Sequence, residues 1–468
     1  MSVGMGDKFG GAMLPNGPHC EQQCAASRLR TKAGKSAESL VPDVPRLPRV
    51  GGLVTVSRSN PGKEIGMGRL ETCHEFYDFY YKMKGGEVVA RPEERKEVGT
   101  GLRERDFYID CLRSVMIALV ILHHTAITYG ASGGWFHHEL PFSGRPSSVI
   151  LSLFCTIEQA YIMGILFLLA GYFTPGSLER KGYACFLGAR NLRLGVPLTA
   201  FVLILGPVTN AMVSAAEGKG FWSGSVLDIG PLWFNEALLI FGLAYCAWRT
   251  WFGAPLTSAQ RAPRPVPSYG WWLLSAVGVG AAALAIRQVV PVGVNVIGLQ
   301  LGYFASYVFL FCLGIAAWRY DWFRQLKWKH ASPWIITLAV AGVSWPAIGA
   351  LATTLNGPGK SNFSGGLSWT AIFYAFWEPF IAWGIISAWL LVFRRYMNRP
   401  SGFWTWLNRR SYAVYIIHPV VLVGISLLLS GWTAPALVKF VVTGSLSCVA
   451  CWILADPLVR TPGVRRVV

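Results

Sequence analysis

Long apolar stretches separated by short polar ones recur between residues 108 and 455. Ten stretches can be distinguished, and each is close to the ~17–25 residues that a helix needs to cross a bilayer. They cover residues 108–130, 149–173, 194–216, 231–250, 270–288, 300–318, 333–354, 369–393, 411–430 and 434–455. The pattern predicts an all-α, polytopic membrane protein with ten transmembrane helices.

Positive charges alternate between the loops that join these stretches. The loops on one side carry nineteen Lys and Arg residues, whereas the loops on the other side carry only Arg145, Lys219, Arg287 and Lys360. Cytoplasmic loops of membrane proteins are enriched in Lys and Arg. We therefore expect an even number of spans, with both termini in the cytoplasm.

Residues 1–104 differ in kind from the rest of the chain. They contain Gly, Pro and charge clusters such as VPDVPRLPRVGG and RPEERKE, and they include no apolar span. The start, MSVGMGDKFGG, lacks the apolar core of a signal peptide. We expect a polar, disordered cytoplasmic extension over 1–104, a membrane domain over 105–460 and a short basic tail over 461–468. A later start at Met67 or Met83 is an open alternative.

The composition supports membrane insertion and changes how the charge is interpreted. The chain is 53% hydrophobic, with 20 Trp residues and a net charge of +18, and its mean hydropathy is +0.41. The basic residues lie between apolar stretches, which indicates membrane topology and not a nucleic-acid partner. Cys448 and Cys451 form a CxxC pattern inside a predicted span, where buried small residues are expected in place of a metal site.

The first span, YIDCLRSVMIALVILHHTAITYG over 108–130, contains the most unusual polar residues. Titratable groups inside a membrane helix are costly and therefore mark functional positions. Arg113 and His124 are eleven residues apart, so they share one helix face and are separated by about 16 Å along it. His123 is turned away by roughly a quarter of a turn.

Carboxylates in other spans are expected at a depth similar to that of His124. Glu158, Glu236 and Glu378 each lie inside an apolar stretch that enters from the same side. His124 is either a general base with a carboxylate on its second ring nitrogen, or a hydrogen-bonded packing residue. Each Glu is either such a partner or an interhelical hydrogen-bonding group.

Three arginines form a second candidate group. Arg113, Arg190 and Arg193 are predicted near the cytoplasmic face, with the last two spaced i,i+3 on one helix face. They either bind phosphate groups through bidentate contacts or anchor the chain to anionic headgroups. Two further histidine positions remain open: His418 inside its span, and the adjacent pair at 137–138 in a loop.

Several segments resemble the acyltransferase family 3 membrane proteins. YIDCLRSVMIALVILHH resembles that family's first-helix signature, in which Arg or Lys is followed by ten residues and then His. ARNLRLGVPL resembles its Arg-x-x-Arg element, and PLWFNEALLIF resembles its Leu-Trp-Phe segment. FLLAGYFTP, LGYFASYVFLFCLGIAAWR and SYAVYIIHP resemble further family segments. The resemblance spans about 108–455, and the sequence around Arg113 is similar to that of the glucan-biosynthesis succinyltransferase-like subgroup.

The resemblance implies transfer of an acyl group, of acetyl or succinyl type, from acyl-CoA to a hydroxyl of a carbohydrate or another envelope acceptor. It marks Arg113, His124, Arg190 and Arg193 as functional positions. We interpret the arginines as the binding site for the anionic donor head and His124 as the general base, oriented by Glu158 or Glu378. We expect a bacterial inner-membrane location, no tightly bound cofactor, no metal and no obligatory protein partner.

Two other functions remain as alternatives. A secondary transporter would use His and Glu near the midplane to relay protons or bind substrate. A membrane sensor or scaffold would use residues 1–104 as its interaction arm and would not need His124.

Overall fold

The computed structural model describes residues 106–220, 228–253, 263–357 and 361–467. Across these residues the chain is helical and forms no strand, and its one β feature is an isolated bridge between Val296 and Leu299. The all-α prediction is therefore confirmed. The predicted extension over 1–104 lies outside the described residues.

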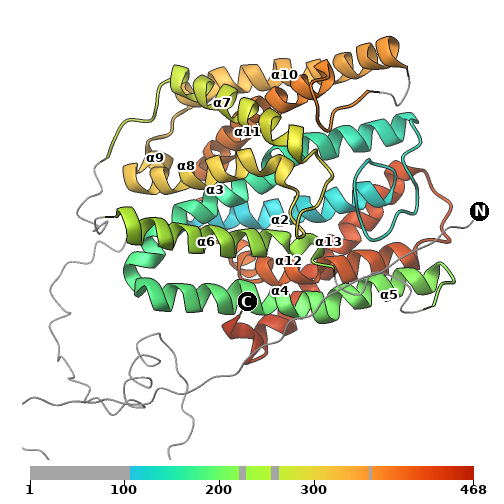
Figure 1. The fold of residues 1–468 in the computed structure, drawn as a ribbon. Coiled ribbons are helices and arrows are strands. Elements are labelled where there is room, and N and C mark those ends of the chain that lie inside the picture. Colours follow the sequence, from blue (N-terminus) through green and yellow to red (C-terminus); the bar gives the residue numbers. More distant parts are fainter. Residues whose placement is uncertain (1–105, 221–227, 254–262, 358–360, 468) are drawn as a thin grey trace, which may run out of the picture. The chain divides into compact units, whose positions relative to one another are not determined.

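Figure 1 shows the long helices, which lie against one another. They are α2 (Phe107–Thr128), α3 (Pro146–Arg190), α6 (Trp233–Phe252), α7 (Tyr269–Val289), α8 (Phe304–Tyr320), α10 (Trp328–Asn356), α11 (Trp369–Tyr396), α12 (Gly402–Leu428) and α13 (Ala436–Arg460). The shorter segments are η1 (Asn191–Gly195), α4 (Val196–Ala200), η2 (Phe201–Leu205), α5 (Gly206–Ala216), η3 (Gly230–Leu232), η5 (Leu301–Tyr303), α9 (Trp322–Gln325) and η6 (Val464–Arg466).

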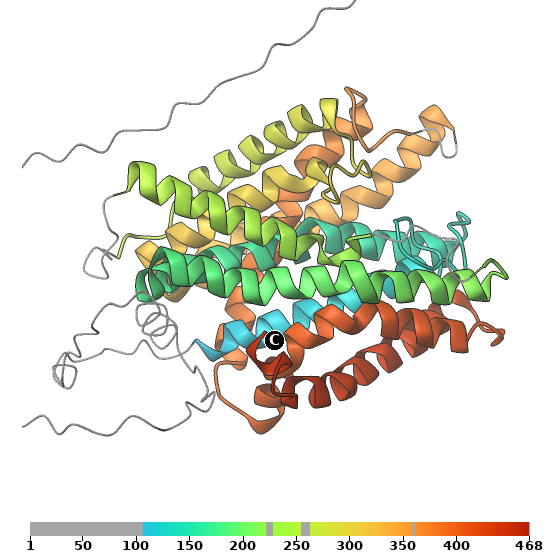
Figure 2. The same cartoon turned by 60° about the horizontal axis from the view of Figure 1, so that its bottom comes forward.

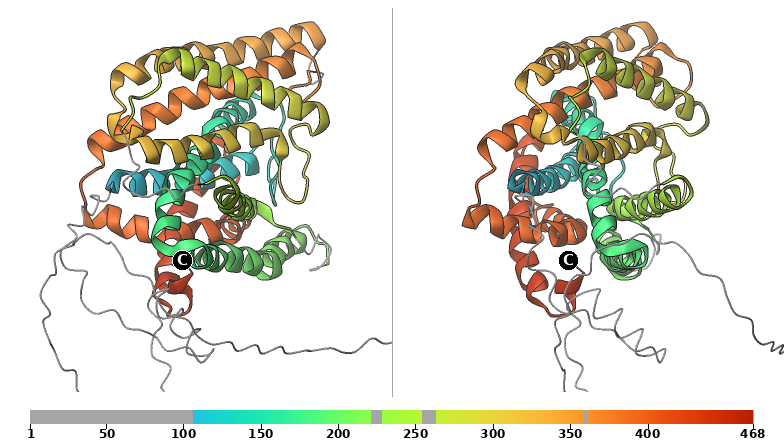
Figure 3. Two further views of the ribbon diagram at one scale, coloured as in Figure 1. Left: turned by 60° about the vertical axis from the view of Figure 1, so that its left-hand side comes forward. Right: turned by 90° about the vertical axis from the view of Figure 1, so that its left-hand side faces the viewer.

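Nine helices in the described part of the chain are long and apolar enough to cross a membrane. The second and third predicted stretches, 149–173 and 194–216, both fall in one of these helices, a run of 71 residues over Pro146–Ala216. Gly182 interrupts that run with φ 71° and ψ 170°, a backbone conformation that glycine adopts and other residues avoid. The chain turns back in this region (Figures 1 and 3), and α5 packs against α12.

Helices α3 and α8 touch backbone to backbone at two glycines. A Cβ atom on Gly171 would lie 2.1 Å from the carbonyl oxygen of Phe311, and one on Gly314 would lie 2.1 Å from that of Leu168. Small residues allow such close approach between membrane helices. The crossing also sets the relative depth of the two helices.

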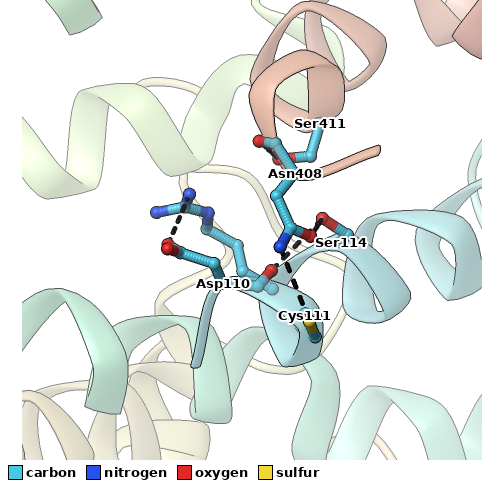
Figure 4. A network of polar contacts seen from close by, with 6 residues as sticks. Asp110, Cys111, Ser114, Asn408 and Ser411 are labelled. Carbon is cyan, nitrogen blue, oxygen red and sulfur yellow. Dashed lines mark hydrogen bonds and ion pairs between the residues drawn. The ribbon is translucent and has the colours of Figure 1, made fainter. Parts of the chain in front are cut away.

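Helix α2 is held at both ends by polar contacts with the last two helices, which lie side by side (Figure 2). Near its start, Ser114 donates to Asn408 Oδ1 at 2.7 Å, and Asn408 Nδ2 donates to Cys111 Sγ at 3.5 Å (Figure 4). Just beyond its end, the hydroxyl groups of Tyr129 and Thr443 lie 2.9 Å apart. These contacts fix the rotation of α2 and hence the direction of its histidines.

Candidate active site

A cavity of about 610 Å³ lies where α2 ends and where α3, α6, α8 and α11 begin. Its wall includes both histidines of α2, His123 and His124. The remaining wall is rich in aromatic, amide and hydroxyl side chains: Trp135, Thr156, Gln159, Asn210, Trp233, Asn295, Gln300, Tyr303, Tyr307 and Tyr374. The cavity therefore has a polar wall next to imidazole groups.

The ring of His124 packs against two other aromatic rings, which do not lie on its opposite faces, since their centroids are only 6.0 Å apart. Trp135, from the loop after α2, stacks on it with centroids 3.8 Å apart and planes 13° apart. His418 of α12 lies nearly parallel to it at 5.5 Å. The Nδ1 atom of His124 is buried and has no hydrogen-bond partner among the described residues. Stacking, and not a carboxylate, orients this imidazole.

Glu158 lies next to the other histidine of α2. Its Oε2 atom is 3.5 Å from Nδ1 of His123, and its side chain is 3% exposed. The expectation that Glu158 orients His124 therefore does not match the observed contacts. The two histidines are neighbours in sequence and meet edge to face at 5.5 Å, but only His123 faces the α3 carboxylate.

Glu378 is paired with Arg287, at the centre of a separate buried cluster. The guanidinium of Arg287 donates to the Glu378 carboxylate and, through Nε, to the carbonyl of Gly302 at 3.0 Å. It lies over the rings of Tyr303 and Tyr374, at 5.5 and 4.9 Å. Arg287 is 1% exposed, so assigning it to an outer loop was wrong. Glu378 thus supports two tyrosines of the cavity wall and does not contact His124.

Arg113 is not in the cavity wall, although it shares a helix with His124. Its Nη2 atom lies 3.1 Å from Oδ1 of Asp110, and its side chain is 42% exposed. Asp110 belongs to the same end of α2 as the Ser114–Asn408 contact (Figure 4). The structure therefore places Arg113 and His124 in different surroundings.

Arg190 and Arg193 do not form a pair on one helix face. Arg190 turns inward, donating to the carbonyl of Leu238 at 3.0 Å and to Thr174 Oγ1 at 2.5 Å, whereas Arg193 is exposed. The segment between them, η1, is π-helical and has more residues per turn than an α-helix, so i,i+3 spacing does not align side chains as predicted.

His418 has a defined tautomer because of the proline that follows it. Pro419 has no N–H group, so the carbonyl of Tyr415 lacks its partner in the helix. The Nδ1 atom of His418 lies 2.7 Å from that carbonyl oxygen, which can only accept, so Nδ1 carries the proton. Its Nε2 atom is buried and has no partner among the described residues.

The loop that carries Trp135 is anchored to α13. Glu139 accepts a hydrogen bond from Lys439, whose side chain is 6% exposed, and Lys439 also lies 6.0 Å from the centre of the Tyr129 ring. His138 Nε2 lies 3.1 Å from the carbonyl of Gly133. No group of three metal-binding side chains occurs among the residues that the structure describes. His138 and Glu139 therefore both make structural contacts that hold this loop.

Several cavity residues could not be identified from the sequence. Trp135, Gln159 and Tyr307 look like ordinary loop and core residues, and the tertiary structure brings Gln159 of α3 to Tyr307 of α8, where Gln159 Nε2 donates to the Tyr307 hydroxyl at 3.0 Å. His123 is visible in the sequence, but helix geometry alone favours His124.

Comparisons with known proteins agree with the sequence motifs. A family model described as an acyltransferase domain, acyltransferase family 3, matches residues 106–456. Glucans biosynthesis protein C of Escherichia coli strain K12 is 24% identical over 156 residues, which are 31% of this chain and 39% of that protein. Its counterparts in strains SMS-3-5 / SECEC and O1:K1 / APEC match over the same lengths with the same identity.

The chain thus spans about two-fifths of the length of these curated relatives, whereas the family model covers most of the chain. A match of this extent does not favour the transporter alternative. The family model shows that the chain belongs to acyltransferase family 3, and nine helices of its described part are long and apolar enough to cross a membrane.

Proposed function

We propose that this enzyme transfers an acyl group from acyl-CoA to a hydroxyl of a carbohydrate, with His124 as the general base. The observation that carries the proposal is the position of His124 on the wall of a cavity lined by aromatic, amide and hydroxyl groups. A histidine in such a position can take the proton of a bound hydroxyl while its oxygen attacks an acyl carbon. Because the nucleophile is a hydroxyl oxygen, the product is an O-acyl ester.

The surroundings of His124 support a role as a base. It stacks on Trp135 and His418, and no carboxylate contacts it among the described residues. A neutral imidazole has a free lone pair for the incoming proton. Stacking on Trp135, with His418 beside it, restricts its rotation, which lowers the cost of reaching the reactive geometry.

The cavity wall, which also includes the carboxylate of Asp228, suits an acceptor that is rich in hydroxyl groups and carries no negative charge. None of its described lining residues is Lys or Arg, whereas amides and phenols that can donate and accept hydrogen bonds are numerous. Aromatic faces can pack against the apolar faces of a sugar ring. The names of the Escherichia coli relatives refer to glucans, which supports a carbohydrate acceptor.

We propose that the three arginines bind the anionic head group of the acyl donor. Arg190 is partly buried and donates to a hydroxyl and a carbonyl, so no carboxylate neutralises it among the described residues. Arg193 is exposed nearby in sequence, and Arg113 offers a guanidinium that is partly paired with Asp110. Guanidinium groups bind phosphates bidentately. Acyl-CoA is then a co-substrate, and neither a tightly bound cofactor nor a protein partner is required.

This arrangement assigns the arginines to the cytoplasmic side of a bacterial inner membrane, with both termini cytoplasmic. The excess of Lys and Arg in alternate loops supports that orientation. The acceptor then approaches from the opposite side, where the cavity lies.

The test is acyl transfer in vesicles that contain the purified protein, supplied with labelled acetyl- or succinyl-CoA and a soluble glucan. We expect labelled glucan with the wild type and a loss of about 10²–10⁴-fold in His124→Ala. His330→Asn is the matched control, because His330 caps α10 away from the cavity and Asn retains a capping oxygen. Equal labelling by His124→Ala and wild type would remove His124 from the mechanism.

A further inference from the structure

The pair formed by His123 and Glu158 is a second titratable unit in the same cavity. His123 lies in the cavity wall, and its side chain is 17% exposed. Glu158 lies behind it at 3.5 Å, and neither of its carboxylate oxygens has a hydrogen-bond partner among the described residues. Within the same part of the chain, His123 is its one ion-pair partner.

Because Glu158 has no other partner among the described residues, the charge of the pair depends on how many protons it binds. An unpaired carboxylate buried in a membrane protein is strongly disfavoured. One proton shared between the carboxylate and the imidazole makes the pair neutral overall, whichever group carries it. The pair therefore holds one exchangeable proton beside the cavity, and His123 presents it there.

His124 differs from its neighbour in this respect. It contacts the neutral rings of Trp135 and His418 and no carboxylate among the described residues, so nothing favours a proton on it before reaction. Two adjacent imidazoles with contrasting surroundings are the arrangement expected for a separate acid and base.

We propose that His123, with Glu158, is the general acid that protonates the departing sulfur of the thioester donor. This inference rests on the proposed function. His124 takes the hydroxyl proton as the acceptor oxygen forms its bond to the acyl carbon. The carbon–sulfur bond then breaks, and the proton of the His123–Glu158 pair passes to the sulfur. The proton on His124 afterwards returns to the pair, which its ring meets edge to face, so the enzyme is restored.

The test varies the basicity of the leaving group. Three donors with the same acyl group are compared: a 4-nitrothiophenyl thioester, the CoA thioester and an oxygen ester of a CoA analogue whose thiol is replaced by a hydroxyl. Each rate is expressed as the ratio of variant to wild type. A general acid matters more as the leaving group becomes more basic.

We expect His123→Gln and Glu158→Gln to slow transfer from the CoA thioester by about 10²-fold, with a larger loss for the oxygen ester and a smaller one for the aryl thioester. His124→Ala should slow all donors alike. Glu236→Gln, which replaces a carboxylate of α6 outside the cavity wall, is the control and should match wild type.

Losses that are equal for the different leaving groups would overturn the inference, as would wild-type rates in His123→Gln. The CoA thioester and the oxygen ester of the CoA analogue are enough to test the inference if the aryl thioester is not a substrate. Thermal unfolding in detergent verifies that each variant is folded. If the wild type labels no hydroxyl acceptor with any donor, the proposed function fails instead.

Discussion

The imidazole rings of His124 and His418 lie nearly parallel, with centroids 5.5 Å apart and planes 14° apart. They come from the first and the penultimate long helices of the described chain. The arrangement depends on Pro419, which frees the carbonyl of Tyr415 and so holds His418 through its Nδ1 atom. A proline in α12 thereby determines how a histidine in α2 is packed.

Replacement of His418 should weaken catalysis without changing donor binding. His418→Ala removes the stacked ring and leaves the Tyr415 carbonyl unpaired, so we expect kcat to fall by about 10-fold, equivalent to about 1.4 kcal/mol. The KM for the donor should stay the same, because His418 does not line the cavity. His418→Gln, whose amide can donate to the carbonyl, should retain more activity. Wild-type kcat in both variants would exclude a positioning role.

The buried pair of Arg287 and Glu378 should dominate the stability of the cavity wall. Removing one partner leaves the other charged and buried, so Arg287→Met and Glu378→Leu should each lower the free energy of unfolding by about 3–5 kcal/mol. The double variant should lose much less than the sum, since no uncompensated charge remains. Denaturant unfolding in detergent micelles measures all three values.

The matched control for this pair is Arg460, which contacts Asp456 at 2.8 Å but is 72% exposed. Solvent screens such a pair, so Arg460→Met should change the free energy of unfolding by no more than about 1 kcal/mol. Additive losses in the Arg287 and Glu378 variants would contradict the coupling.

The contact between α3 and α8 should not tolerate a methyl group at Gly171. A Cβ atom there would meet the Phe311 carbonyl oxygen at 2.1 Å, and backbone cannot move aside as a side chain can. We expect Gly171→Ala to destabilise the protein by about 1–3 kcal/mol or more. Acyl transfer should fall too, because the Gln159–Tyr307 contact depends on this crossing.

Gly278 of α7 provides the comparison for that substitution, since a Cβ atom there would have nothing within 4 Å. Gly278→Ala should leave stability unchanged or raise it by about 0.5–1 kcal/mol, because Ala favours the helix. Thermal unfolding of both variants checks the difference. Equal effects would mean that the close approach is not a packing constraint.

Acidification should weaken the loop that carries Trp135, through His137. Burial lowers the pKa of His137 below its usual value of 6.5, although Glu139 and Glu217 act in the opposite direction and His138 adds to the lowering. As the pH falls below 6.5, the unfolded chain binds a proton at His137 while the folded chain does not. The stabilisation is therefore complete above pH 6.5 and is lost as the pH falls toward the lowered pKa.

His137→Gln should lose less stability than wild type between about pH 7.5 and about pH 5.5. The difference in unfolding temperature between the two proteins at each pH isolates His137 from other titrating groups. Parallel losses in the two proteins would show that this histidine does not contribute.

Much of the membrane domain follows from local sequence. Every predicted apolar stretch coincides with a helix, because a chain in lipid must satisfy its own backbone hydrogen bonds and a helix does so within one segment. Arg287 shows where this reasoning stops. It falls at the end of an apolar stretch and looks like a loop charge, yet its partner Glu378 is 91 residues away in the chain.

The sequence by itself determined the helices, their membrane-spanning length and the family. Only the tertiary structure decided that Glu158 faces His123, that Glu378 faces Arg287 and that Trp135 and His418 hold His124. The physical reason is that a long apolar stretch forms a helix whatever its neighbours are. The choice of a polar partner, by contrast, depends on how each helix is rotated and on how deep it lies relative to the others. Those are set by contacts between distant segments, such as the approach of Gly171 to Phe311.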